Sequence, residues 1–330
     1  MRVLNVFSIM DTLIGTDIND AKNLLEAGDL CAIPTETVYG LAANALNADA
    51  VAKIFEAKDR PRFDPLIIHV PSIIKLHEYV TSLPQWAMKL ATEFMPGPLT
   101  LVLDKKECIP DIVTSGLNTV AIRVPDHPIT VELLNLLDFP LAAPSANPFG
   151  YISPTTAQHV YDQLEGKIPY ILDGGECSIG IESTIVGQSN GWPVILRLGG
   201  ITAEDIRSVI GKCEIQTHSS SDPLNPGSLE HHYAPRHTLI FDSMNFEGYD
   251  PNEIGIISFQ KVYEGIPKEN QYVLSQSGVL REAAQKIFSA MRTLDSKEIK
   301  VIFAEGFPDE GLGRAINDRL KRASTQNTVL

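Results

Sequence analysis

The sequence predicts an α/β protein built from two units. Through residue 211, short apolar segments typical of strands alternate with amphipathic segments typical of helices. A stretch rich in serine, proline and histidine follows at 212–237, and the alternation then resumes on a smaller scale. A chain of 330 residues is also long for a single core. We therefore predict a first domain over 1–211, a linker over 212–237 and a small domain over 238–330.

The elements of the first domain follow from the spacing of apolar residues and from turn residues at their ends. We expect helices at 17–27, 48–58, 73–79, 85–94, 129–137 and 156–164, with one more opening at 202. We expect strands at 30–33, 66–70, 99–103, 119–124, 141–143, 170–173, 183–186 and 194–198. Thr16 is expected to cap the first helix and Gly28 to end it.

The second domain shows the same two patterns in fewer residues. We expect strands at 239–241, 255–259, 272–274 and 301–304, and helices at 279–294 and 313–323. This is a small α/β unit of Rossmann-like character, and it is large enough to fold.

Composition limits the partners that the chain can have. The net charge is -14, and residues 1–211 hold 14 Lys and Arg against 25 Asp and Glu. Such an acidic domain lacks the broad basic surface of a non-specific nucleic-acid binder. No apolar run has the length of a membrane span, and the first residues lack the features of a signal peptide. The four cysteines show no CxxC spacing, so we expect no zinc site, no disulfides and a cytoplasmic location.

One segment, residues 58–70, is basic within this acidic chain. It reads Lys-Asp-Arg-Pro-Arg-Phe-Asp-Pro-Leu-Ile-Ile-His-Val, and its two prolines stiffen it ahead of an expected buried strand. A rigid cationic loop beside a core strand favours a bound anion such as phosphate. A solvated loop with local acidic partners explains the same residues equally well.

Other polar residues stand at the ends of expected strands, where ligands often bind in open α/β sheets. Glu36 lies between two threonines, and Ser145-Ala146-Asn147 lies between two prolines. A Gly-rich stretch over 173–187 could approach a ligand through its backbone but matches neither common nucleotide fingerprint. Turns stabilised by side-chain bonds account for each of these segments as well.

Two arginines, Arg123 and Arg197, interrupt apolar strands and so need a carboxylate or a bound anion as partner. His69 ends a strand in the same way, although most buried histidines are ordinary core residues. The pair His231-His232 has no third ligand at useful spacing, which makes a metal site a weak hypothesis. From the residues alone we predict a basic pocket for an anionic ligand, with the reaction unassigned.

Six motifs in one order resemble the YrdC-like family, specifically its L-threonylcarbamoyladenylate synthases. They are Pro34–Leu41, Lys58-x-Arg60-Pro61 with Asp64-Pro65-Leu66, Pro96–Thr100, Ala121–Pro125, Pro144–Asn147 and Ser183–Val186. The run Pro226-Gly227-Ser228-x-x-His231-His232-Tyr233-Ala234-Pro235 is similar to the linker of the longer, two-domain form. The resemblance implies a twisted open sheet with a basic concave cavity, followed by a small domain.

The resemblance also implies an activity and its partners. L-threonine, bicarbonate and ATP, the last with Mg²⁺, would give threonylcarbamoyl-AMP, pyrophosphate and water. Downstream transfer proteins would then place the threonylcarbamoyl group on the adenosine beside the anticodon of certain tRNAs, and a contact of this chain with tRNA is also implied. No protein-held metal and no membrane are implied.

The positions that match the family's motifs imply three sets of site residues. The catalytic cavity residues are Lys58, Arg60, Ser145 and Asn147. The threonine side comprises Thr35, His69, Arg123, Ala143 and Ser183. The ATP side comprises Arg60, Asp64, Thr119, Ser145, Ser153, Arg197 and Tyr233. Asp64 departs from the Asn of many relatives. Because Tyr233 comes from the linker, we expect the linker to close over the cavity as a lid.

Three other readings are open at this point. One is an RNA-binding module, against which the net charge of the first domain counts. Another is the carbamoyl-phosphate-using relative of hydrogenase maturation, whose acylphosphatase and zinc-finger segments this chain lacks. The third is a regulatory binder in which residues 238–330 are the working part.

Overall fold

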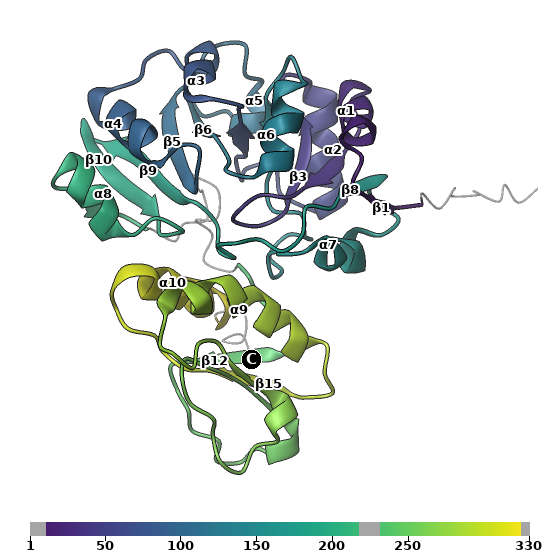
Figure 1. Cartoon of the computed structure of the whole chain (residues 1–330), viewed down its shortest axis with the longest axis vertical. Helices are drawn as coiled ribbons and strands as arrows, with labels where there is room; N and C mark the ends of the chain where they lie inside the picture. The colour runs from purple at the N-terminus through teal and green to yellow at the C-terminus, as the bar shows by residue number, and fades with distance from the viewer. Residues whose placement is uncertain (1–10, 218–231, 325–330) are drawn as a thin grey trace, which may run out of the picture.

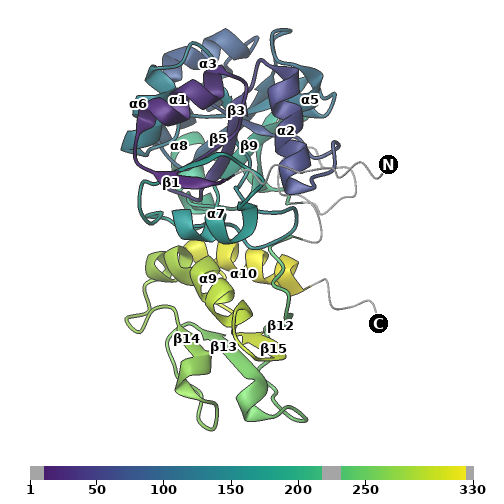
Figure 2. The same ribbon diagram turned by 90° about the vertical axis from the view of Figure 1, so that its right-hand side faces the viewer.

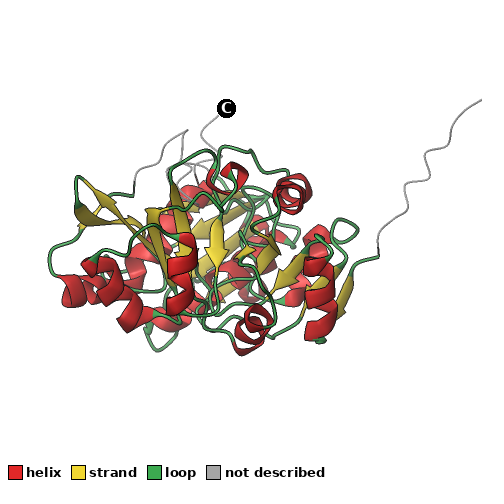
Figure 3. Cartoon of the chain, turned by 90° about the horizontal axis from the view of Figure 1, so that it is seen from above, coloured by secondary structure: helices red, strands yellow, loops and turns green. Residues whose placement is uncertain are grey.

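The structure is a computed structural model in which residues 11–217 and 232–324 are described. Within these residues the strands form one sheet of eleven strands and a separate sheet of four (Figure 1). Helices surround the larger sheet, as the view from above shows (Figure 3). The predicted α/β class, with a large twisted sheet and a small second unit, is confirmed. No helix among the described residues is both long enough and apolar enough to span a bilayer.

The larger sheet is mixed, and its strand order is β1-β8-β2-β3-β7-β4-β6-β5-β9-β10-β11. Its strands are β1 (Leu13–Gly15), β2 (Cys31–Ile33), β3 (Gly40–Asn44), β4 (Ile67–His69), β5 (Leu99–Asp104), β6 (Thr119–Arg123), β7 (Leu141–Ala142), β8 (Tyr170–Leu172), β9 (Thr184–Ser189), β10 (Trp192–Arg197) and β11 (Glu214–Ile215). The helices around it are α1 (Ile18–Glu26), α2 (Ala48–Lys58), α3 (Ile73–Tyr79), α4 (Gln85–Phe94), α5 (Asp111–Thr114), α6 (Pro128–Asn135), α7 (Ala157–Leu164) and α8 (Ala203–Ile210).

The smaller sheet is parallel throughout, in the order β12-β15-β13-β14. Its strands are β12 (Thr238–Phe241), β13 (Ile254–Ser258), β14 (Gln271–Val273) and β15 (Val301–Ala304), with short 3-10 turns η1 (Pro251–Glu253) and η2 (Lys268–Asn270). The helices α9 (Leu280–Asp295) and α10 (Gly311–Ser324) lie between this sheet and the larger unit (Figure 2). The two long amphipathic helices therefore form the face through which the small unit contacts the rest of the chain.

Contacts across that face are both apolar and polar. One continuous cluster of buried apolar side chains includes Ile152 and Ile181 of the larger unit together with Phe288 of α9. Tyr151 donates a hydrogen bond of 2.5 Å to Asp295 at the end of α9. The hydroxyls of Thr155 and Ser289 lie 3.1 Å apart. The interface thus combines a buried apolar centre with specific hydrogen bonds.

Gly180 sits where the loop before β9 meets α9, and its backbone has a φ of +79°. A Cβ atom there would overlap the backbone of Gln285 in α9. We expect Gly180→Ala to lower the free energy of unfolding by about 1–3 kcal/mol, because it adds both a left-handed Cβ penalty and a steric clash. Urea denaturation measures this. Gly175→Ala is the matched control, since Gly175 has φ +83° with open space around it. Equal losses in the two variants would contradict a tight contact at Gly180.

The structure departs from the sequence-based elements in a few places. Asp17, and not Thr16, caps α1, because its carboxylate accepts the backbone N–H of Asn19. Strands β1 and β3 and the short helix α5 were not expected. Residues 218–231 of the expected linker lie outside the described residues. Within the expected linker, β11 pairs with β10 at the edge of the larger sheet.

Candidate active site

A cavity lies where strands near the middle of the larger sheet end. His69 ends β4 and Arg123 ends β6, and these parallel strands place the two residues in register. Ser183 precedes β9, and Arg197 ends β10 beside it. We call this space the central cavity. It is lined by Thr35, Thr37, Val38, Gly40, Arg60, Ile67, His69, Arg123, Ala143, Pro144, Ser145, Glu182, Ser183, Arg197, His232 and Tyr233.

Arg123 is held in place before any ligand binds. Its guanidinium forms an ion pair of 2.5 Å with Glu36 and donates a hydrogen bond of 2.9 Å to the hydroxyl of Thr37. A third bond runs to the backbone oxygen of Gly97. Arg123 and Glu36 are both buried. Glu36 and Thr37 therefore fix the orientation of Arg123 in the cavity. This pairing explains why an acidic side chain is present in the loop after β2.

Arg60 is fixed by its own loop. It pairs with Asp64 at 2.8 Å and donates to the backbone oxygens of Asp64 and Pro65. Its guanidinium also lies over the ring of Phe149, 5.9 Å from the centroid. Asp64 is fully buried and does not line the central cavity. Its carboxylate is thus placed as a partner of Arg60 behind the wall.

Lys58 supports the loop that carries Ser145 and Asn147. Its ammonium donates hydrogen bonds of 2.5 Å to the backbone oxygens of both residues. Asn147 in turn donates to the backbone oxygens of Pro148 and Tyr151. Burial, helped by the charge of Arg60, lowers the pKa of Lys58 well below its ordinary value. Of these three residues, only Ser145 lines the cavity.

The linker end contributes two aromatic side chains to the cavity. The rings of His232 and Tyr233 pack edge to face, with centroids 4.1 Å apart, and Tyr233 stacks on Phe288 of α9 at 5.5 Å. Tyr233 adopts a left-handed backbone, with φ of +67°. Burial lowers the pKa of His232 to about 3 and raises that of Tyr233 to about 12, so neither side chain carries charge near neutrality.

The residues that line the cavity carry more positive than negative charge. Among the described residues, Arg60, Arg123 and Arg197 are the lining cations, and Glu182 is the lining carboxylate. Three cations against one carboxylate leave two positive charges in excess. Because these groups are buried, their field is weakly screened, and the cavity is suited to an anion.

Two further predicted residues, in addition to Lys58, Asp64 and Asn147, do not line the cavity. Thr119 begins β6, at the opposite end from Arg123, and lines a separate depression with Leu103 and Leu117. Ser153 is buried behind the wall, where it donates a hydrogen bond of 2.6 Å to Glu182.

Some residues of the site were not among the site residues predicted from the sequence. Glu182 and His232 line the cavity, and Arg319 of α10 contacts it from behind through Glu182. A signal for Arg319 exists in the helix pattern, because it lies on the same buried stripe as Ile316 and Ala323. An arginine on an apolar stripe needs a buried partner.

His69 lines the cavity as a neutral side chain, and its shifted pKa predicts that the stability of the fold depends on pH. Burial, together with the charge of Arg123, lowers its pKa to about 3. An unfolded histidine titrates near about 6.5, so below that pH the unfolded chain binds a proton that the folded chain does not. The neutral His69 therefore contributes its whole share of the free energy of unfolding above about pH 6.5. This share declines as the pH falls towards 3, by up to about 1.4 kcal/mol for each pH unit.

We therefore expect His69→Gln to reduce the dependence of unfolding free energy on pH. The measurement is urea denaturation at intervals from pH 7 to pH 5, with wild type and variant in parallel. Identical slopes in the two proteins would contradict a neutral, buried His69. Among the described residues, no group of three or more His, Cys, Asp or Glu side chains is placed to hold a metal ion.

Taken together, the fold and the site define an α/β protein whose cavity is lined by an excess of cationic side chains and is suited to a small anion. Two family models match the chain: one described as Telomere recombination over residues 23–199, and one described as Threonylcarbamoyl-AMP synthase, C-terminal domain, over 201–325. The chain therefore belongs to the threonylcarbamoyl-AMP synthase family, in the form that carries the C-terminal domain.

Individual relatives match along nearly the whole chain. The threonylcarbamoyl-AMP synthase of Pyrococcus abyssi is 40% identical over 332 residues, 97% of this chain and 97% of that protein. The Bacillus subtilis enzyme of the same name is 40% identical over 325 residues, 93% of this chain and 92% of that protein. The crystal structure of P. abyssi Sua5 complexed with L-threonine matches with a TM-score of 0.87 and 39% identity, covering 96% of this chain and 98% of that one.

Proposed function

We propose that this chain is an L-threonylcarbamoyladenylate synthase. It converts L-threonine, bicarbonate and ATP into threonylcarbamoyl-AMP, pyrophosphate and water. The product serves the threonylcarbamoyladenosine modification of tRNA beside the anticodon, through separate transfer proteins in the cytoplasm. One observation carries the proposal: a single cationic cavity gathers nine of the residues expected from the motifs. These are Thr35, Arg60, His69, Arg123, Ala143, Ser145, Ser183, Arg197 and Tyr233.

The reaction requires two anions to meet. Threonine and bicarbonate give N-carboxy-threonine, whose new carboxylate attacks the α-phosphate of ATP and displaces pyrophosphate. Positioning and charge stabilisation do most of the work in such a step. An excess of buried positive charge supports both functions, because fixed guanidinium groups need little reorganisation as charge develops.

On the threonine side, Arg123 would bind the amino acid's carboxylate through its planar guanidinium. Glu36 and Thr37 already hold that group in one orientation. Thr35, His69, Ala143 and Ser183 would complete the side. The neutral state of His69 suits it to hydrogen bonding beside a cation. All five residues line the cavity.

On the ATP side, Arg60 and Arg197 would clamp the phosphates, and Ser145 would contact ATP as well. Lys58 and Asn147 would act by fixing the backbone of the Ser145 loop, as their hydrogen bonds to that loop support. Mg²⁺ would arrive on the phosphates of ATP, largely hydrated, as is usual for this ion. Asp64, Ser153 and Thr119 would act at a greater distance, given their positions outside the wall.

We also propose a division of labour along the chain. Residues 1–211 would form the catalytic domain, 212–237 the linker and lid, and 238–330 the small C-terminal domain. His232 and Tyr233 support the lid hypothesis, because both line the cavity and are almost fully buried. A lid would exclude water from a labile product.

The proposal is tested by pyrophosphate release from MgATP, with L-threonine and bicarbonate each present or omitted, and by mass spectrometry of the product. We expect release only when both are present, together with a detectable threonylcarbamoyl-AMP. ATP turnover that is indifferent to threonine, or no turnover by folded protein, would refute the proposal. Detection of the adenylate without tRNA would place transfer in a later, separate step.

A further inference from the structure

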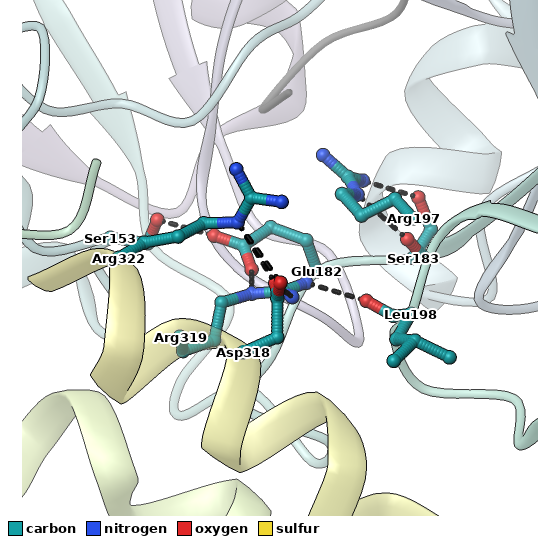
Figure 4. A network of polar contacts seen from close by, with 8 residues as sticks. All are labelled: Ser153, Glu182, Ser183, Arg197, Leu198, Asp318, Arg319 and Arg322. Atoms are coloured by element: carbon teal, nitrogen blue, oxygen red, sulfur yellow. Dashed lines mark hydrogen bonds and ion pairs between the residues drawn. The ribbon is translucent and has the colours of Figure 1, made fainter. Parts of the chain in front are cut away.

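Among the described residues that line the central cavity, Glu182 supplies the only carboxylate, and its place in a cavity proposed to bind phosphates needs explanation. Glu182 lies in the loop before β9 and is only 7% exposed. Its two oxygens accept hydrogen bonds from Ser153 at 2.6 Å and from Arg319 at 2.8 Å (Figure 4). Arg197 lies on the other side of this loop, bonded to Ser183 (Figure 4). The carboxylate thus sits between the expected phosphate clamp and the small domain.

Arg319 reaches Glu182 from a different part of the chain, the helix α10 of the small unit. Its side chain is fully buried, and it donates to the backbone oxygen of Leu198 at 2.8 Å and to Asp318 at 2.8 Å. The guanidinium also lies over the ring of Tyr233, 5.2 Å from the centroid. A single side chain of the small unit therefore contacts the loop before β9, the segment after β10 and the linker end.

Charge explains why this contact bears on the ligand. Burial opposes ionisation of Glu182, yet the charges of Arg319 and Arg197 and the bond from Ser153 hold its pKa below the ordinary value. A glutamate that stays charged would repel phosphates entering the cavity unless a cation neutralises it from behind. Arg319 is placed to do so, with its guanidinium nitrogens directed at Glu182, Asp318 and Leu198.

We propose that Arg319 is a positioning residue of the ATP site, by which the C-terminal domain neutralises Glu182 and fixes Tyr233 so that the cavity accepts phosphate. The inference rests on the proposed function in one respect only, that the cavity binds ATP. Arg319 itself does not line the cavity, so its effect must pass through Glu182 and Tyr233.

The test compares two arginines of the same helix. Arg314 also crosses the interface, through an ion pair of 2.6 Å with Glu204 of α8, but it lies remote from the cavity wall. We expect Arg319→Met to weaken MgATP binding and raise KM for ATP by about 10-fold or more, because it leaves a buried carboxylate unpaired beside the phosphates. Arg314→Met should change neither value by more than about 2-fold, as is usual for exposed pairs.

A second-site change separates charge from domain docking. In the Arg319→Met background, Glu182→Gln removes the negative charge that Arg319 no longer neutralises, without restoring the contact to Leu198. We expect this double variant to recover much of the lost affinity for MgATP. Arg319→Lys, which keeps a charge but loses the fork geometry, should lie between wild type and Arg319→Met, and it provides a folded comparison if the Met variant does not accumulate.

Calorimetric titration with MgATP and turnover with threonine are measured separately. If wild type binds MgATP but shows no threonine-dependent turnover, the proposed reaction fails while the role of Arg319 is still decided by the affinities. Affinities for MgATP that are equal in Arg319→Met and Arg314→Met would overturn the inference. So would a double variant that is no better than Arg319→Met, or an Arg319→Lys variant equal to wild type.

Discussion

Replacing Arg60 with methionine is expected to reduce kcat/KM for threonylcarbamoyl-AMP formation by about 100-fold or more, the usual effect of losing one preorganised donor to developing charge. Arg60 lines the cavity, and three contacts within its own loop fix it there. Methionine resembles the unbranched aliphatic part of arginine but contributes no charge. The measurement is pyrophosphate release at varied ATP with threonine and bicarbonate held in excess.

Arg62 offers a matched control two residues away. Its side chain is exposed and lines no part of the central cavity. Arg62→Met removes the same charge from the same loop, so it should leave turnover nearly unchanged. Circular dichroism checks that both variants are folded. If the two variants lose activity equally, the general charge of the loop matters, and the assignment of Arg60 as a clamp is wrong.

Replacing Arg123 with methionine is expected to lower the free energy of unfolding by about 3–5 kcal/mol, because it leaves the buried carboxylate of Glu36 without its counter-ion. Glu36 is 4% exposed, and its oxygens have no hydrogen-bond partner among the described residues apart from the ion pair with Arg123. Urea denaturation of the variant and the wild type measures the loss.

The double variant Arg123→Met with Glu36→Gln separates stability from binding. It should regain part of the lost stability, since no unpaired charge stays buried. It should not regain saturation by threonine, because the proposed partner of the threonine carboxylate is still absent. A double variant that binds threonine like wild type would show that Arg123 is only structural. Equal stability of the single and double variants would contradict the pairing with Glu36.

Much of the fold could be predicted because the local signals are strong. The apolar spacing of α2 and α4 gives their bounds directly, Ala48–Lys58 and Gln85–Phe94. Strand β3 was missed because its residues, Gly-Leu-Ala-Ala-Asn, include no β-branched or aromatic side chain. Strand β1 was missed because its pairing with β8 joins residues about 157 positions apart, as in Leu13 with Tyr170. Such a contact leaves no trace in local sequence.

The site residues also divide into those that the sequence could predict and those that it could not. Motif positions at strand ends, such as Thr35 and Arg197, could be assigned because the resemblance supplied their grouping, and the structure brings them together. Motif position alone could not separate the wall from the shell behind it. Lys58 and Asp64 match the motifs as well as Arg60 does, and only their contacts show that they lie behind the cavity wall. Arg319 fell outside every motif, and only its place on an apolar stripe marks it.

The apolar cluster that crosses the interface bears on how the chain unfolds. Separate domains joined by modest, polar interfaces usually move and melt independently. Here Ile152 and Ile181 share one buried cluster with Phe288 and Leu320, and Tyr233 of the linker end belongs to the same cluster. Opening the interface would expose this core to water, which costs about 25 cal/mol of free energy for each Å² of apolar area. We therefore expect the two sheets to unfold as one cooperative unit, although the sequence pattern divides them into two.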